Sequence, residues 1–194
     1  MKKIGVFLLI LGAAAALSAC SHGKSKDVSG ASMPEEIYAS PDYNMYRNAK
    51  VGVFPFMSPE YARGAGNSAA SVFCRQLEKN RVFSAVHLEA DVPPQAIAEI
   101  AKAKRYDLVI TGAVLYWFEG STLEPSRVEQ EVTVFKPSSK GDRILWRARL
   151  METGWPVQPK DYLLGQTHAV PAPSAMTLVQ KNAGKFCKML LAGR

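Results

Sequence analysis

The chain is 194 residues long, is 47% hydrophobic and 21% charged, and carries a formal net charge of +7. This length is enough for one domain with a substantial core after an N-terminal leader is set aside. The basic residues are scattered rather than gathered into a stripe with interleaved aromatic residues, so the composition argues against nucleic acid as a partner.

The N-terminus has the three zones of a secretory signal peptide. Lys2 and Lys3 are followed by an almost unbroken apolar run over residues 4–17, and the small residues Ser18 and Ala19 come next. A transmembrane helix is the alternative, but the apolar run is shorter than the roughly 18 residues that favour a membrane-spanning helix. The sequence therefore predicts a cleavable leader over residues 1–19.

Leu17, Ser18, Ala19 and Cys20 together resemble the lipobox of bacterial lipoproteins. The resemblance implies that Cys20 carries a diacylglyceryl thioether and that the leader is cut after Ala19. Each buried methylene of such lipid chains contributes about 0.8 kcal/mol, so the membrane becomes a lasting partner through this anchor. Within this class an aspartate after the cysteine favours the inner membrane. Ser21 stands there instead, so we expect anchoring at the periplasmic face of the outer membrane.

Residues 20–47 are expected to form the lipidated N-terminus and a tether. The first part is polar and rich in Ser, Gly and Lys, as in a flexible linker. Residues 37–46 are too aromatic for a simple linker, so they either pack on the domain or dock on a partner. Residues 48–194 are expected to form a single α/β domain.

The domain is expected to open with a short apolar strand over residues 49–56, which ends near a proline. A loop over residues 57–66 leads into a helix that begins at Asn67 or Ser68, either of which can cap it, and ends near Asn80. A second strand follows over residues 82–88.

The next helix is opened by Pro93 and Pro94, and Ile97, Ile100 and Ala101 are expected to face inward. Residues 106–117 then form the strongest predicted strand. Its centre, Leu108, Val109 and Ile110, is apolar on both faces, as in a strand buried from both sides.

Residues 127–136 and 144–151 alternate between apolar and polar side chains and are predicted to form an antiparallel hairpin. Residues 154–173 contain four prolines and are expected to be irregular. Ser174 can cap the last helix. The predicted order is strand, helix, strand, helix, strand, hairpin, helix, which indicates an α/β fold: a mixed sheet with helices packed on it.

Four segments carry a family resemblance: residues 51–56, 69–77, 81–83 and 106–112. Together they are similar to the group of periplasmic lipoproteins that contains the curli secretion protein CsgG, the amino-terminal domain of TolB and the activator LpoB, and the resemblance covers residues 49–190. The resemblance implies an accessory or assembly role in the cell envelope, often as an oligomer, with no catalytic residues to carry over. The hairpin departs from the transmembrane hairpins of the curli pore, because charged residues stand on its strands.

Two cysteines remain once Cys20 is assigned to the lipid. In an exported chain, Cys74 and Cys187 are candidates for a disulfide, provided that their two helices are neighbours; buried free thiols are the alternative. The three histidines show no ligand spacing with each other or with the cysteines, so we expect neither a metal site nor a bound cofactor.

Gly64, Gly66 and Ser68 precede the first predicted helix, where backbone N–H groups could approach an anion. The lysine and Ser/Thr that end a phosphate-binding loop are absent, so a loop with unusual torsions is the favoured interpretation. The carboxylates Glu129 and Glu131 share one strand face, which we interpret as solvated. No nucleophile motif is present, so the chain is not expected to be an enzyme.

Three aromatic residues near irregular segments are candidate interface residues: Trp117, Trp155 and Tyr162. Core packing is the alternative for the two tryptophans. The sequence thus predicts a non-catalytic envelope lipoprotein that assembles with itself or with an envelope partner in secretion, polysaccharide export or cell-wall synthesis. The alternative is a periplasmic binding module for a small anionic or cell-wall ligand at residues 64–68.

Overall fold

The computed structural model describes residues 37–138, 141–162 and 165–192. The leader, Cys20 and the first part of the expected tether lie outside these ranges. The elements in chain order are β1 (Ile37–Ala39), η1 (Pro41–Tyr46), β2 (Lys50–Val53), η2 (Glu60–Ala62), α1 (Ala65–Lys79), β3 (Ala85–Leu88), η3 (Pro94–Ala96), α2 (Ile97–Ala103), β4 (Leu108–Phe118), β5 (Ser126–Lys136), β6 (Arg143–Gly154), β7 (Asp161–Tyr162), β8 (Gly165–Gln166) and α3 (Ala175–Ala192).

A six-stranded mixed sheet organises the fold, with strand order β1-β6-β5-β4-β2-β3. Strands β3, β2 and β4 are parallel, whereas β4, β5, β6 and β1 are joined by antiparallel pairings. The parallel part is built from two strand–helix–strand units, because α1 connects β2 to β3 and α2 connects β3 to β4. The predicted α/β fold with a mixed sheet is confirmed.

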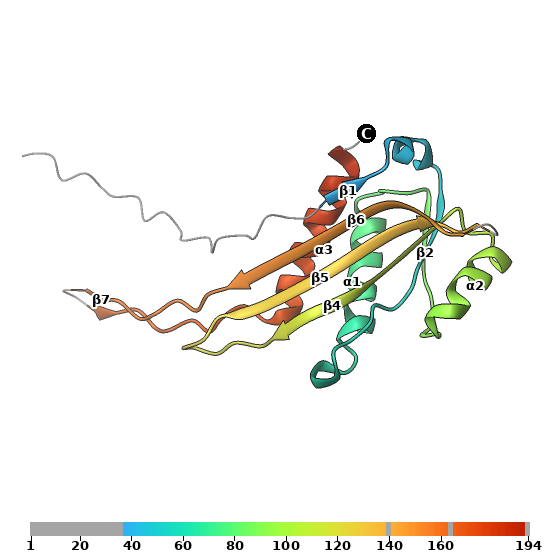
Figure 1. The fold of residues 1–194 in the computed structure, drawn as a ribbon. Coiled ribbons are helices and arrows are strands. Elements are labelled where there is room, and N and C mark those ends of the chain that lie inside the picture. Colours follow the sequence, from blue (N-terminus) through green and yellow to red (C-terminus); the bar gives the residue numbers. More distant parts are fainter. Residues whose placement is uncertain (1–36, 139–140, 163–164, 193–194) are drawn as a thin grey trace, which may run out of the picture.

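The helices cover both faces of this sheet, and β4 shows why. Its residues Leu108 and Ile110 point into the larger core, to which α1 and α3 contribute. Val109, between them, points into a smaller core with Ile97 and Ala101 of α2. In Figure 1, α2 lies over the end of the sheet formed by β2 and β4, and α1 and α3 run side by side on the other face. The prediction of a strand buried on both faces is confirmed.

The long hairpin β5–β6 forms as predicted, and its alternation holds. Val128, Gln130, Val132 and Val134 are all buried under α1 and α3. With 11 and 12 residues, β5 and β6 span about 35–40 Å at the usual rise of a strand, so they reach beyond the helices. Their far end continues into a narrow arm that projects from the body (Figure 1).

The arm corrects the expectation that residues 154–173 are irregular. Strand β6 continues to Gly154, Val157 pairs with Val170, and β7 and β8 form a small hairpin beyond that pair. The four prolines divide the arm into short paired pieces, because each proline lacks the N–H that a ladder requires, but they do not prevent the chain from pairing.

The predicted beginnings of two elements are also corrected. Helix α1 begins at Ala65, before both Asn67 and Ser68. Its N-cap is Gly64, which has a φ of 82°, a conformation that favours glycine. The second strand begins at Ala85 rather than at residue 82. The chain first turns through the end of α1 and places Val82 and Phe83 in the core.

Residues 37–46 pack on the domain, which was one of the two alternatives for them. Ile37 pairs with Ala148 and Ala39 with Trp146, so β1 is an edge strand beside β6. The folded part therefore begins inside the range expected for the tether, ten residues or so before the expected start at residue 48. No helix in the described ranges is long and apolar enough to cross a membrane.

Candidate functional site

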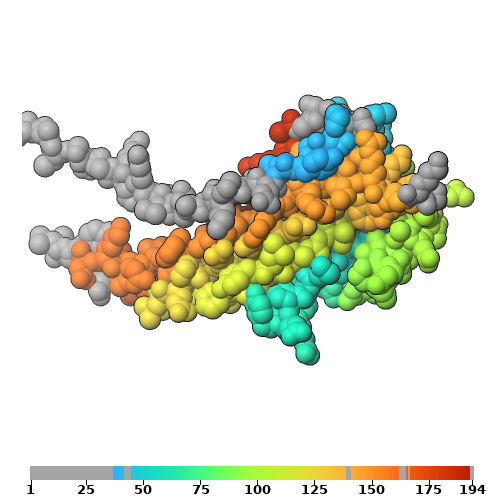
Figure 2. Space-filling view, viewed as in Figure 1, coloured from blue at the N-terminus to red at the C-terminus, as the bar shows by residue number. Residues whose placement is uncertain are grey.

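Large apolar side chains are exposed around the base and length of the arm. Trp155 is 57% exposed and Leu123 is 80% exposed, and Val157 and Val170 are more than half exposed. These four residues come from three segments joined by hydrogen bonds: Gln158 Nε2 donates to the carbonyl of Thr122, and Val157 and Val170 exchange backbone hydrogen bonds. Figure 2 shows the arm, in orange, extending away from the body. We call Leu123, Trp155, Val157 and Val170 the apolar arm patch.

The structure separates the three predicted interface residues. Trp155 belongs to the apolar arm patch, so the core-packing alternative is wrong for it. Trp117 is half-buried against the main core, and its backbone N–H donates to the Tyr61 hydroxyl at 3.2 Å. Tyr162 lies in β7, and its side chain is outside what the structure describes.

Trp117 and the predicted anion loop meet at a shallow hollow of about 240 Å³, lined by Arg63, Gly64, Ser68 and Trp117 among others. Two backbone N–H groups of this loop are already bonded. The N–H of Gly66 donates to Ser58 Oγ at 2.8 Å, and that of Ser68 donates to the carbonyl of Gly64. A side chain at Gly66 would meet the carbonyl of Phe56, so this glycine allows close packing. Both glycines thus have structural roles.

The two paired carboxylates differ in environment. Glu131 is partly exposed and lies 3.6 Å from Arg147. Glu129 is only 8% exposed, so its interpretation as a solvated residue is wrong. Arg149 Nε donates to it at 2.6 Å, and Arg127 lies on its other side at 3.4 Å. Each carboxylate is thus held by arginine, as in a structural charge network on the open face of the sheet.

Cys74 and Cys187 are free and buried, on α1 and α3 respectively. Helices α1 and α3 are neighbours, as a disulfide requires, but the two cysteines are not bridged in the structure, which matches the alternative of buried free thiols. Burial raises the pKa of each thiol to about 11, which keeps both protonated at neutral pH. Within the described residues, no three His, Cys, Asp or Glu side chains are placed to hold a metal ion.

A second polar cluster ties α2 to the sheet. Glu89, just after β3, accepts hydrogen bonds from the Tyr106 hydroxyl and, at 2.6 Å, from Lys104 Nζ. The Tyr106 ring lies so close to Gly52 that a side chain there would clash with it. Burial alone would raise the pKa of Glu89, but the hydrogen bonds from Lys104 and Tyr106 outweigh it and lower that pKa. The cluster is a clamp between secondary-structure elements.

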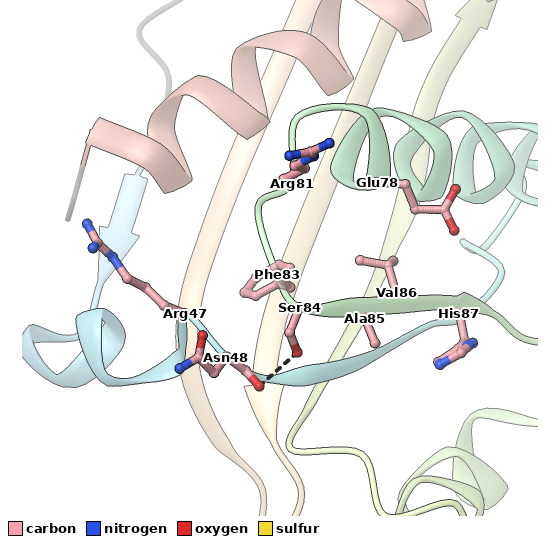
Figure 3. Close-up of a pocket in the computed structure, with 9 residues that line it drawn as sticks. All are labelled: Arg47, Asn48, Glu78, Arg81, Phe83, Ser84, Ala85, Val86 and His87. Atoms are coloured by element: carbon pink, nitrogen blue, oxygen red, sulfur yellow. Dashed lines mark hydrogen bonds between the residues drawn. The ribbon is translucent and has the colours of Figure 1, made fainter.

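A hollow larger than the one beside Gly64 was not anticipated from the sequence. It has a volume of about 640 Å³ and runs beside β3, the last strand of the sheet. Figure 3 shows its three walls: the segment just before β2, the end of α1, and β3 itself. The sequence shows a short strand preceded by Arg81, but the pairing order that leaves β3 at the edge is a tertiary feature. The lining residues are Arg47, Asn48, Glu78, Arg81, Phe83, Ser84, Ala85, Val86 and His87.

No protein-family model and no curated protein matches this sequence. Among solved structures, the chain is similar to the PelC dodecamer from Paraburkholderia phytofirmans, with 19% identity and a TM-score of 0.60 over 80% of this chain and 95% of PelC. A variant of the same dodecamer aligns with 17% identity and a TM-score of 0.59, over 81% of this chain and 98% of that one. At these identities the likeness shows a shared fold.

Proposed function

We propose that this chain is a non-catalytic, lipid-anchored accessory protein of the bacterial envelope that assembles with copies of itself or with an envelope partner. The proposal keeps the expected grouping with CsgG-like lipoproteins and the expected outer-membrane location. The observation that carries it is geometric: Ile37, the first described residue after the expected tether, is the end of β1 that lies nearer to the arm.

The direction of β1 supports this geometry. It runs antiparallel to β6, with Ile37 opposite Ala148 and Ala39 opposite Trp146. Ile37 is therefore the end of β1 nearer to Gly154, where the arm begins. Trp155 is seven positions beyond Ala148, about 23 Å along a strand. The 17 residues from Cys20 to Glu36 can extend about 55–60 Å, so a lipid on Cys20 can reach the surface that the arm touches.

The chemistry of the arm suits a membrane surface. A tryptophan and aliphatic side chains that gather at one end of a chain, beside a lipid anchor, can enter the interfacial region while polar neighbours stay in water. Lys160 and His168 lie farther along the arm and can meet anionic headgroups. We infer that the arm faces the membrane and that the α/β body lies on the side of the arm away from the membrane.

The likeness to PelC supports self-assembly, because that protein was solved as a dodecamer. A ring of identical subunits requires a head-to-tail interface between two different surfaces of each copy. The process that such an assembly serves is one of the three expected from the sequence: secretion, polysaccharide export or cell-wall synthesis. The binding-module alternative retains only the shallow hollow beside Gly64, where two loop amides are already engaged.

The test uses the full-length chain expressed in a Gram-negative host. We expect the wild-type chain in the outer-membrane fraction, acyl-labelled and released only by detergent, whereas Cys20→Ser is unlabelled and leaves that fraction. In detergent, light scattering should give a defined oligomer. A Cys74→Ser variant is the matched control, because it removes a thiol without touching the lipobox. Acyl labelling that persists in Cys20→Ser, or a strict monomer that binds muropeptides, would contradict the proposal.

A further inference from the structure

The groove beside β3 combines an unpaired strand edge with a positively charged rim. β3 is the last strand of the six-stranded sheet, and among the described residues no strand pairs with its outer side. The N–H of Glu89 donates to the carbonyl of Val53 in β2, at 2.9 Å. Because backbone groups alternate sides along a strand, Val86 and Leu88 direct their N–H and C=O groups away from β2. This edge therefore offers hydrogen bonds in the pattern of an incoming strand.

The walls of the groove add specificity to that edge. Phe83 and Val86 are buried and supply an apolar floor. Arg47 and Arg81 line the groove from two different segments, whereas Glu78 is the only carboxylate in its lining. The hollow measures about 640 Å³ and follows a strand of four residues, about 13 Å long. Its shape suits an extended peptide, and its charge suits one that carries carboxylates.

We infer that the β3 groove is a docking site for an extended, acidic segment of a partner protein, which adds a seventh strand to the sheet. Backbone hydrogen bonds to Val86 and Leu88 supply affinity, and carboxylates of the partner meet Arg47 and Arg81. This inference rests on the proposed accessory role, for which it names one partner surface. The groove is on the opposite edge of the sheet from β1, and hence from the membrane tether.

Arg81 makes the charge contribution testable without damage to the fold. It has a φ of 49°, and it occupies the position after a helix end that usually holds glycine. Its N–H donates to the carbonyl of Glu78, and Val82 donates to Leu77, as that motif requires. Arg81→Gly therefore removes the charge and relieves backbone strain at once. We expect it to raise the urea midpoint of unfolding while it weakens binding of the acidic segment about three- to tenfold.

Leu88 makes the strand contribution testable. Its side chain is 48% exposed, and its N–H points away from β2. Leu88→Pro removes that outward N–H and none of the hydrogen bonds to β2, and Leu88→Ala is the matched control that keeps the N–H. The proline variant should bind the acidic segment about tenfold more weakly than the alanine variant, since one backbone hydrogen bond is lost and the edge is blocked.

The experiment measures binding of fluorescent seven-residue peptides to the full-length chain in detergent, by anisotropy. An alternating glutamate–valine peptide should bind, and an alternating lysine–valine peptide of the same length should not. Equal binding of the two peptides, no binding up to millimolar concentration, or unchanged affinity in both Arg81→Gly and Leu88→Pro would overturn the inference. Dissociation of the native oligomer by Leu88→Pro would also overturn it, because the occupant would then be a second copy. None of these outcomes affects acylation or membrane fractionation, so failure of the inference is distinct from failure of the proposed function.

Discussion

Two arginines stand where glycine is usual, at the C-terminal ends of α1 and α2. Arg105 has a φ of 56°, its N–H donates to the carbonyl of Lys102, and Tyr106 donates to Ala101. This is the same pattern as at Arg81. A side chain in the left-handed region costs about 1 kcal/mol, which the arginine partly offsets through its charge near the negative end of the helix dipole.

We predict that Arg105→Gly raises the free energy of unfolding by about 0.5 kcal/mol, because relief of strain exceeds the added freedom of the unfolded chain. Arg105→Ala should give no such gain, since alanine retains the side-chain clash in this conformation. Urea unfolding of both variants checks the difference. Equal midpoints for the glycine and alanine variants would show that the backbone at this position is unstrained.

The clamp at Glu89 predicts an acid-sensitive contribution to stability. The pKa of Glu89 lies below its ordinary value of 4.5, so its ionised form favours the folded state. That contribution is complete above the ordinary pKa and is lost as the pH falls through the lower, folded-state value. Stability of the wild type should therefore fall faster than that of Glu89→Gln between about pH 5 and pH 3. Glu60→Gln, at an exposed position in η2, is the control; identical acid profiles for wild type and Glu89→Gln would sink the prediction.

At the scale of elements, α3 and β5 share a polar contact inside the main core. Asn182 Nδ2 donates to Gln130 Oε1 at 3.0 Å, and both residues are fully buried. Among the described residues, Gln130 Nε2 and Asn182 Oδ1 have no hydrogen-bond partner. Buried amides that are only partly satisfied cost stability, but they fix how the helix is placed on the sheet.

We expect Asn182→Leu alone to destabilise the chain by about 1–3 kcal/mol, because it leaves the whole amide of Gln130 unpaired. The double variant with Gln130→Leu should recover most of that loss, since neither amide then remains buried. Denaturant unfolding of the two single variants and the double variant forms a complete cycle. Additive losses in the double variant would contradict a direct coupling between the two side chains.

The arm is expected to contribute little to the stability of the fold. A two-stranded ribbon is marginally stable in water by itself, and this one exposes the apolar arm patch. We predict that Trp155→Ser, in a Cys20→Ser background, lowers partitioning to anionic lipid vesicles about three- to tenfold with no change in unfolding midpoint. Met45→Ser is the control, since Met45 is 81% exposed but lies in η1, beyond the opposite end of β1. An equal loss in both variants would argue against an oriented arm.

At the scale of the whole molecule, two separate surfaces are assigned to two different binding roles. The apolar arm patch, which we propose faces the membrane, lies beyond the arm-side ends of β5 and β6, and the β3 groove lies along the edge of the sheet opposite β1. A chain arranged in this way can be anchored and bind a partner at the same time. Sedimentation of the full-length chain with lipid vesicles and the acidic peptide together should recover all three components in one fraction. Competition between vesicles and peptide would contradict the separation of the two surfaces.

The sequence by itself determined much of this protein, because the signals were local. Strict alternation predicted the β5–β6 hairpin, and the apolar centre of residues 108–110 predicted a strand covered on both faces; both predictions are confirmed. Charge followed by an apolar run predicts the leader, which stays a prediction because residues 1–36 lie outside the described ranges. These patterns are set by the periods of strands and helices, so they can be read without knowledge of contacts. The family resemblance added an expected role in the envelope, and it added no site residues.

Only the tertiary structure decided the rest, because it depends on which segments meet. Residues 37–39 pair with β6, so they belong to the sheet rather than to the expected tether. Glu129, expected to be solvated, is buried and contacts arginines from two strands. The order of strands left β3 at an edge between Arg47 and Arg81, which are 34 positions apart in the sequence. Burial, edge exposure and the proximity of charges depend on which segments pack together, and the pattern within one segment does not specify its neighbour.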